Sequence, residues 1–209
     1  MESENAKFLR EFYLSPYIQL ATALIGKSRE AGGNMFRHQM DTMAILIDYA
    51  YIDSVLLKAA VVHDLIEDIP DFNRNHLLNV DYESPQVYEL VMEVSRRPGE
   101  SKPDFLTRIL REGSHRAQLL KTADRISNMI SLGFVNNEAF VKRYTEETAA
   151  YVFPIAEKAD RQMLRELTIL VESRRKYLVF MNSHHEQSSA PAAPAADAVP
   201  AAPAAADAS

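Results

Sequence analysis

Apolar residues recur along most of the chain at the spacing of amphipathic helices, and strand-like alternation is nearly absent. In residues 16–29, for example, Tyr17, Leu20, Leu24 and Ile25 follow one helical face. This pattern predicts an all-α fold, an irregular helical bundle, over residues 5–181. The predicted helices span residues 16–29, 37–51, 54–66, 103–111, 116–131, 137–157 and 160–181, with a further helix opening at residue 84 and an irregular stretch at 70–83.

The end of the chain differs in character from the rest. From Ser183 to Ser209, alanine and proline dominate and large apolar residues are almost absent. Such a segment buries too little apolar surface to offset the entropy of ordering it. The sequence therefore predicts one folded domain over residues 1–182 and a disordered Ala/Pro-rich tail over residues 183–209.

Composition and charge narrow the function classes. The 209-residue chain is 47% hydrophobic and carries a formal charge of -6, which argues against nucleic acid as a partner. A small phosphorylated ligand remains compatible, because a local pocket can be positive on an acidic protein. The chain contains no cysteine, which excludes disulfides, thiolate zinc sites and cysteine nucleophiles.

The distribution of apolar runs bears on localisation. The polar start of the chain has no signal-peptide core, and no apolar run approaches the roughly 20 residues of a membrane span. We therefore expect a cytoplasmic protein without a membrane partner.

One segment, residues 63–68, places two polar pairs directly after an apolar run. His63 and Glu67 are four residues apart, as are Asp64 and Asp68, so on a continuous helix each pair shares a face. Carboxylates beside an apolar run are costly unless they are paired or bind a metal. The alternative is a solvated helix end with its acids facing water, although acids there oppose the helix dipole.

Two further segments contain candidate ligands. Asp124 and Asn128 lie four residues apart in a helix predicted to be mostly buried, although an Asp–Arg pair taken alone is more often a surface salt bridge. His38 stands near a helix start after a glycine pair, where a lone histidine is commonly just a polar residue. Together, His38, His63, Asp64 and Asp124 would suit a divalent ion, with manganese or another transition metal favoured over calcium and zinc still possible.

The order of these residues, H…HD…D, resembles the HD phosphohydrolase superfamily. The finer match is to the hydrolase domain of the RelA/SpoT homologues, which degrade the alarmone (p)ppGpp. It rests on HDxxED at residues 63–68, on KxADRxxNM at residues 121–129 and on the segment 144–156, and it covers about residues 15–160. The chain leaves no room for the synthetase domain of the long family members, so we expect it to be similar to the stand-alone small alarmone hydrolases.

The resemblance implies a fold of the HD-domain type and a function, hydrolysis of the 3′-pyrophosphate of (p)ppGpp to GDP or GTP and pyrophosphate. It also implies a role for each matching residue. Glu67 and Asp68 match the acidic pair that positions or activates the attacking water. The implied metal ligands, usually for Mn²⁺, are His38, His63, Asp64 and Asp124. The implied contacts to the guanine nucleotide are Arg29, Lys102, Asn128 and Tyr144.

Some positions depart from the family pattern or have a second explanation. Glu30 stands where the family often has a basic residue, and the turn at residues 32–35 and the loop at residues 96–99 are atypical. Arg29 would also end a predicted helix, where the dipole favours any cation.

Two other functions remain open at this point. One is an HD phosphatase of another nucleotide, either a 5′-nucleotidase or an NADPH phosphatase. The other is an inactive HD fold that serves as a nucleotide sensor. Loss of a metal ligand would favour the sensor, and none is lost here.

Overall fold

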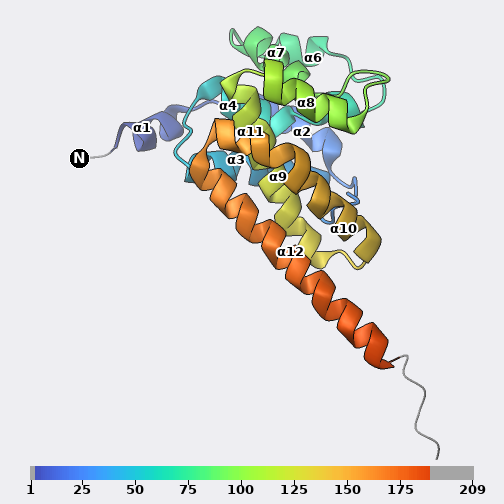
Figure 1. Cartoon of the computed structure of the whole chain (residues 1–209). Helices are drawn as coiled ribbons and strands as arrows, with labels where there is room; N and C mark the ends of the chain where they lie inside the picture. The colour runs from blue at the N-terminus through green and yellow to red at the C-terminus, as the bar shows by residue number, and fades with distance from the viewer. Residues whose placement is uncertain (1–2, 189–209) are drawn as a thin grey trace, which may run out of the picture.

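A computed structural model of the chain describes the backbone of residues 3–188 and the side chains of residues 3–181. Within this range the regular structure is helical, and the only strand-like pairing is one isolated bridge between Ser28 and Asn34 (Figure 1). The prediction of an all-α fold is therefore confirmed for the described residues. No helix among them is both long and apolar enough to cross a lipid bilayer.

The helices follow one another with short connections. In chain order they are α1 (Glu4–Glu11), α2 (Ser15–Ala21), α3 (Met35–Asp48), α4 (Ser54–Val62), α5 (Leu65–Asp68), α6 (Asn75–Leu78), α7 (Ser84–Val94), α8 (Lys102–Glu112), α9 (His115–Ser131), α10 (Glu138–Glu147), α11 (Phe153–Ala159) and α12 (Arg161–Ser188). Short 3₁₀ turns follow α2 (Thr22–Leu24) and α9 (Leu132–Phe134), and a π-helical turn, Thr148–Val152, joins α10 to α11.

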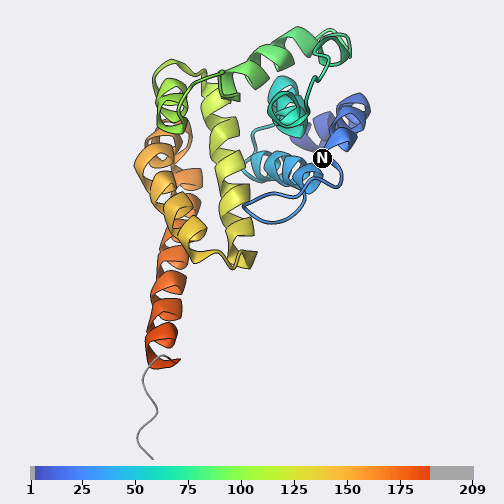
Figure 2. The same cartoon turned by 90° about the vertical axis from the view of Figure 1, so that its right-hand side faces the viewer.

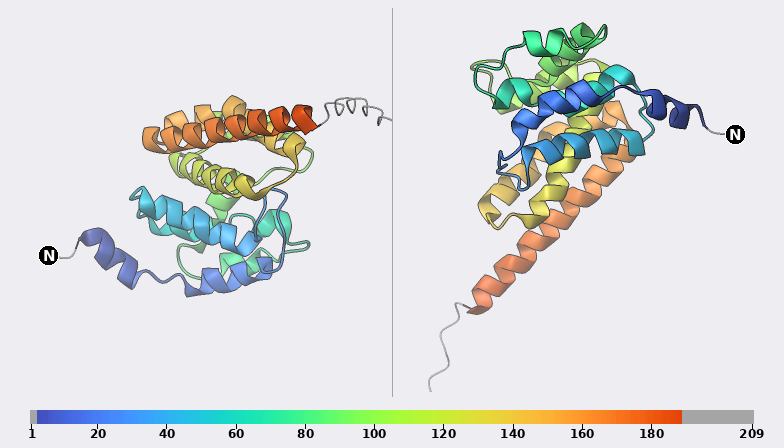
Figure 3. Two further views of the ribbon diagram at one scale, coloured as in Figure 1. Left: turned by 90° about the horizontal axis from the view of Figure 1, so that it is seen from below. Right: turned by 180° about the vertical axis from the view of Figure 1, so that it is seen from behind.

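Helix α9 lies at the centre of the fold. Helices α3 and α4 pack against one side of it, and α11 and α12 pack against another (Figures 2 and 3). A helix covered on several sides needs apolar residues on several faces, and α9 buries Leu120, Ala123, Ile126 and Met129 completely. Each large apolar side chain buried in this way contributes roughly 1.5–3 kcal/mol to the free energy of unfolding.

The starts of α3 and α4 are fixed by local capping. The Asn34 side chain accepts a hydrogen bond from the Arg37 N–H at 3.3 Å, and the Asp53 side chain accepts one from the Leu56 N–H at 2.8 Å. Asparagine and aspartate are favoured at this position because their oxygens satisfy an otherwise unpaired N–H of the first turn. These caps place His38 in the first turns of α3 and His63 at the end of α4.

Three predicted helices differ from the observed ones. The segment 16–29 leaves the α-helical conformation at Ala21, and Gly26 adopts a left-handed φ of +84°, so Arg29 lies in a loop. The explanation of Arg29 as a cation at a helix end is therefore wrong. The segment 54–66 breaks at His63 and Asp64. The segment 137–157 is interrupted by the π-helical turn before Pro154, whose nitrogen cannot donate a helical hydrogen bond.

Other boundaries shift less. The short helix α6 lies inside the stretch 70–83 that was predicted to be irregular. At the other end, α12 continues to Ser188, past the predicted end of helix at residue 181. The rest of the predicted tail, residues 189–209, lies outside the described residues.

The loop that carries Arg29 is held against the end of α9. Gly32 has φ +86°, a conformation that residues with a Cβ rarely adopt. A methyl group at Gly32 would also lie 3.3 Å from the Ser131 carbonyl oxygen and 3.3 Å from a Val135 methyl. The tight approach at Gly32 therefore fixes the position of the loop relative to α9.

We predict that Gly32→Ala lowers the free energy of unfolding by about 2 kcal/mol, because it combines backbone strain with a close contact. Gly26→Ala is the matched control, since Gly26 has a similar φ of +84° but open space around its Cβ position. We expect it to cost about 1 kcal/mol, from strain alone. Urea unfolding measures both values, and equal losses would contradict the packing role of Gly32.

Candidate functional site

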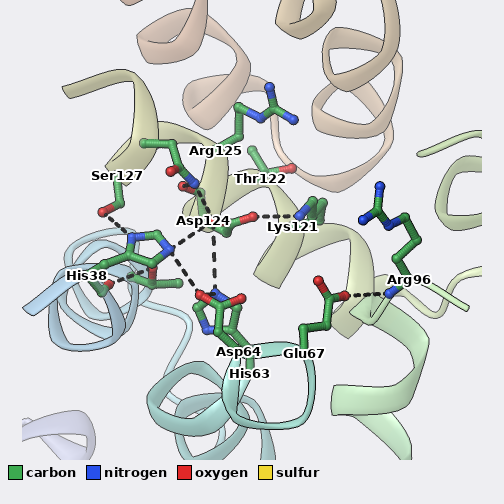
Figure 4. Close-up of polar contacts among 12 residues, drawn as sticks. His38, His63, Asp64, Glu67, Arg96, Lys121, Thr122, Asp124, Arg125 and Ser127 are labelled. Atoms are coloured by element: carbon green, nitrogen blue, oxygen red, sulfur yellow. Dashed lines mark hydrogen bonds and ion pairs between the residues drawn. The ribbon is translucent and has the colours of Figure 1, made fainter. Parts of the chain in front are cut away.

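The four residues predicted to bind a metal come together from three parts of the chain (Figure 4). His38 lies on α3, His63 and Asp64 form the turn between α4 and α5, and Asp124 lies on α9. His38 Nε2 is 3.1 Å from Asp124 Oδ1 and 3.6 Å from Asp64 Oδ2. His63 Nε2 is 3.3 Å from Asp64 Oδ2 and 3.9 Å from Asp124 Oδ1. Imidazole nitrogens and carboxylate oxygens from residues distant in sequence therefore lie close together at one place in the fold.

The break in the helix at His63 makes this convergence possible. Adjacent residues of a continuous helix point in different directions. Here the Asp68 N–H still donates to the Asp64 carbonyl oxygen at 2.9 Å, so the chain resumes a helical turn immediately after the break. The separate turn lets His63 and Asp64 face the same point, which the prediction of one helix over residues 54–66 did not provide.

The orientation of His63 leaves one ring nitrogen available. Its Nδ1 lies 2.8 Å from the Ala60 carbonyl oxygen, which can only accept, so Nδ1 carries the proton. Its Nε2 is buried and has no hydrogen-bond partner. A buried nitrogen lone pair without a donor is costly in a protein interior but suits a metal ligand.

His38 is oriented in a similar way. Its Nδ1 lies 2.8 Å from the Ser127 hydroxyl, and burial lowers the pKa of the imidazole, against the opposing effects of Asp124 and Asp64. A lowered pKa favours the neutral ring, which is the form that binds metals. One ligand atom from each of the buried residues His38, His63 and Asp124 lies within 4.8 Å of the other two, and this group could hold a metal ion.

The two carboxylates are supported by neighbouring side chains. The Gln39 amide donates to Asp64 Oδ2 at 2.8 Å, and the Lys121 ammonium contacts Asp124 Oδ2 at 2.7 Å. Burial raises the pKa of Asp124, but Lys121 and the two imidazoles outweigh it and hold that pKa well below its usual range. Asp124 is therefore ionised and ready to accept a cation.

The acidic pair lies beside this group. Glu67 Oε1 accepts a hydrogen bond from the backbone N–H of Arg96, which fixes the carboxylate in place (Figure 4). Burial, together with the charges of Asp64 and Glu67, raises the pKa of Asp68 to about 6. Both side chains line the same cleft as His38, Asp64 and Asp124.

This cleft has a volume of about 390 Å³ and opens above the histidine–aspartate group. All four residues predicted to contact a nucleotide line it, as do additional cations at Arg96, Lys121 and Arg125. A cleft with several cations on a chain of net charge -6 favours an anionic ligand. The predicted nucleotide-binding residues are Arg29, Lys102, Asn128 and Tyr144.

Two networks hold these four residues in place. The Arg29 guanidinium donates to the Asn128 side-chain oxygen, and the Asn128 amide donates to Asp124, so the cleft wall is tied to the candidate metal group. On the other wall, the Tyr144 ring lies 4.8 Å from Lys102 Nζ and 4.2 Å from the Arg125 guanidinium carbon, and both cations contact Glu147 Oε1 at 3.0 Å. Burial and the Arg125 charge lower the pKa of Lys102.

Sequence reasoning missed several supporting residues. Gln39 and Ser127 orient Asp64 and His38, and the Arg96 backbone holds Glu67. Lys121 stands three residues before Asp124, a spacing that could have suggested the ion pair. The other three contacts join distant segments, and no local pattern marks them.

The sequence of this chain was compared with protein families and with known proteins. No family model matches the chain. The chain is 27% identical over 146 residues to the GTP pyrophosphokinase rsh of Brucella ovis and of Brucella abortus. The aligned part covers 67% of this chain and 19% of those relatives, so the chain spans about a fifth of their length.

A solved structure is also similar. It is a metazoan orthologue of SpoT, described as hydrolysing ppGpp and playing a role in starvation responses. The TM-score is 0.61 at 20% identity, and the match covers 83% of this chain and 97% of that one. The resemblance to the RelA/SpoT homologues predicted from the motifs is thereby confirmed, and the chain has the helical fold of a SpoT orthologue.

We predict that Asp124→Asn lowers the affinity for Mn²⁺ more than Ser127→Ala does. The first change removes a ligand charge, whereas the second removes only the partner of His38, a kind of change that costs roughly 10- to 100-fold in metal affinity. Asp41→Asn, on the exposed side of α3, is the control and should bind like the parent. Calorimetric titration measures all three, and equal affinities of Asp124→Asn and the parent would count against the site.

The raised pKa of Asp68, about 6, predicts a pH dependence. Between about pH 4, where the carboxyl ionises in the unfolded chain, and pH 6, the native state binds more protons than the unfolded state. The stability of the metal-free protein therefore falls as pH rises through this window. Asp68→Asn removes this loss, so its gain in melting temperature over the parent should grow from pH 4 to 6 and then level off. A gain independent of pH would contradict the assignment.

Proposed function

We propose that this chain is a metal-dependent hydrolase that removes the 3′-pyrophosphate of (p)ppGpp, giving GDP or GTP and pyrophosphate. One observation carries the proposal: His38, Asp64 and Asp124 line a cleft that also holds several cations, and the buried Nε2 of His63, which has no hydrogen-bond partner, converges on the same carboxylates. The likeness to a SpoT orthologue that hydrolyses ppGpp supports the choice of substrate.

The four converging residues would hold the metal, with Mn²⁺ the cation implied by the family resemblance. Two imidazole nitrogens and two carboxylates form a mixed donor set suited to a divalent transition metal. When bound, such an ion neutralises phosphate charge and makes water a better nucleophile at neutral pH. Ser127, Ala60, Gln39 and Lys121 keep the donor atoms in place through the contacts described above.

The acidic pair, Glu67 and Asp68, would accept the proton that the attacking water loses. Glu67 is fixed by the Arg96 N–H at one oxygen, and its other oxygen can accept a proton from the attacking water. Water adds to the phosphorus next to the ribose 3′ oxygen, the bond between them breaks, and the 3′ oxygen takes up a proton as pyrophosphate leaves. Asp68, whose pKa of about 6 is close to neutrality, can share a proton with Glu67 during this step.

The cleft walls would bind the nucleotide. The Arg29 guanidinium donates to the Asn128 side chain and could contact a phosphate or the base, and Asn128 would lie near the ribose, as the family resemblance implies. The Tyr144 ring, which contacts both Lys102 and Arg125, offers a flat surface beside positive charge. These roles follow from the family resemblance and from the shared cleft.

Incubation of the purified protein and Mn²⁺ with ppGpp, followed by detection of pyrophosphate, tests the function. We expect GDP and pyrophosphate in equal amounts, and no reaction with a chelator present. A panel containing pppGpp, NADPH and nucleoside 5′-monophosphates separates the proposal from the phosphatase alternatives. Release of orthophosphate from NADPH or from a monophosphate, with ppGpp left intact, would overturn the assignment, and binding without turnover of any substrate would favour a sensor.

We predict that Glu67→Gln lowers kcat by about 100- to 10,000-fold, the range typical of a lost general base. Glutamine keeps the size of the side chain and an oxygen that can accept the Arg96 N–H, but it cannot take up a proton. Metal content and melting temperature should therefore match those of the parent.

Glu112→Gln, at an exposed position of α8, is the matched control and should leave kcat unchanged. Near-normal turnover in both Glu67→Gln and Asp68→Asn would exclude the acidic pair from proton transfer. Loss of bound metal in Glu67→Gln would instead make Glu67 a metal ligand.

A further inference from the structure

A second cavity adjoins the candidate cleft at the loop between α7 and α8. It has a volume of about 510 Å³ and is lined by Glu67 and by residues 96–101. Glu67 and Arg96 line both cavities, so the two hollows meet at these residues. A ligand bound above the histidine–aspartate group could therefore extend past Glu67 toward this loop.

The loop is held in a defined shape. The Glu100 carboxylate accepts from the Arg97 N–H at 2.9 Å and forms an ion pair with Arg108 at 2.8 Å. Gly99 has φ +76°, which lets the chain turn back toward α8, and the Ser101 side chain caps that helix by accepting from the Asp104 N–H. Loop geometry therefore does not depend on the side chains of Arg96 and Arg97.

The charges of the loop are unbalanced. Arg108 neutralises Glu100, and hydrogen bonds from Arg108 lower the pKa of that carboxyl to about 2. By contrast, neither the Arg96 nor the Arg97 guanidinium has an ion-pair partner among residues 3–181, and both side chains are exposed. Figure 4 shows the Arg96 guanidinium directed away from the Glu67 carboxylate that its own backbone N–H binds. Two cations are thus free to meet a ligand.

We propose that Arg96 and Arg97 form a diphosphate-binding subsite of the candidate active site, at its Glu67 end. The proposal rests on the proposed function and names the part of the substrate that this loop would hold. A guanidinium binds phosphate oxygens through two parallel N–H groups, which gives both affinity and orientation. Because (p)ppGpp carries phosphate chains at its 3′ and 5′ positions, either chain has the chemistry that this subsite recognises.

The subsite would also offset the repulsion between the carboxylates of the cleft and a polyphosphate ligand. Glu67, Asp68 and Asp64 place carboxylates along one side of the cleft, and these repel a polyphosphate. Arg96 and Arg97 stand next to Glu67 and offset that repulsion without pairing with the carboxylate. Glu67 can then remain ionised as a proton acceptor while an anion lies nearby.

Steady-state kinetics with ppGpp test the proposal through Arg96→Ala, Arg97→Ala and the double variant. We expect the double variant to raise KM about tenfold with kcat little changed and the metal content equal to that of the parent. Arg111→Ala removes an exposed arginine of α8 that lines neither cavity, and it should behave like the parent. An unchanged KM in the double variant, or a loss of metal from it, would overturn the proposal.

A binding measurement separates this proposal from the hydrolytic function. The metal-free protein is titrated calorimetrically with inorganic pyrophosphate and, separately, with GDP, so that no turnover is needed. Weaker pyrophosphate binding in the double variant assigns the subsite to the 3′ chain, and weaker GDP binding assigns it to the 5′ chain. Equal affinity of parent and double variant for both ligands, or no binding of either ligand by the parent, overturns the subsite even if ppGpp is hydrolysed.

Discussion

The packing of α3 against α9 is the contact on which the rest of the site depends, because it holds His38 Nε2 3.1 Å from Asp124 Oδ1. The same helix contact lets Ser127 reach the other nitrogen of His38. Apolar burial along α9 supplies the free energy that keeps these polar groups together, since isolated buried charges would be costly. The geometry of the site thus depends on the packing of the hydrophobic core beneath it.

Much of this arrangement is encoded in local patterns. Helical spacing of apolar residues predicted the all-α fold, and the cap of α4 by Asp53 follows the ordinary residue preference at helix starts. The prediction that the histidine and carboxylate residues share a site rested on their combination and on the family resemblance, because each segment alone also had a solvated or salt-bridged explanation. Their convergence in space followed from the motif order, not from any measurable local property.

Other features depend on tertiary contacts and could not be read from the sequence. Helical periodicity continues through His63 and Asp64, yet the structure breaks there so that both side chains face one point. Periodicity also carried the first helix too far, because the left-handed Gly26 and Gly32 redirect the chain before and after Arg29. The backbone of Arg96 meets Glu67 across 29 positions of sequence, a distance over which no pattern of neighbours carries information.

The buried Nε2 of His63 would couple the folding of this chain to the binding of the proposed metal ion. Leaving such an atom without a partner costs roughly 1–3 kcal/mol of native-state free energy. A cation that binds there relieves this cost only in the folded chain, because the unfolded chain does not assemble the donors. Each tenfold rise in free cation above the dissociation constant then adds about 1.4 kcal/mol to stability. Under the proposed function, the melting temperature of this protein would therefore rise with the concentration of the divalent cation in the medium.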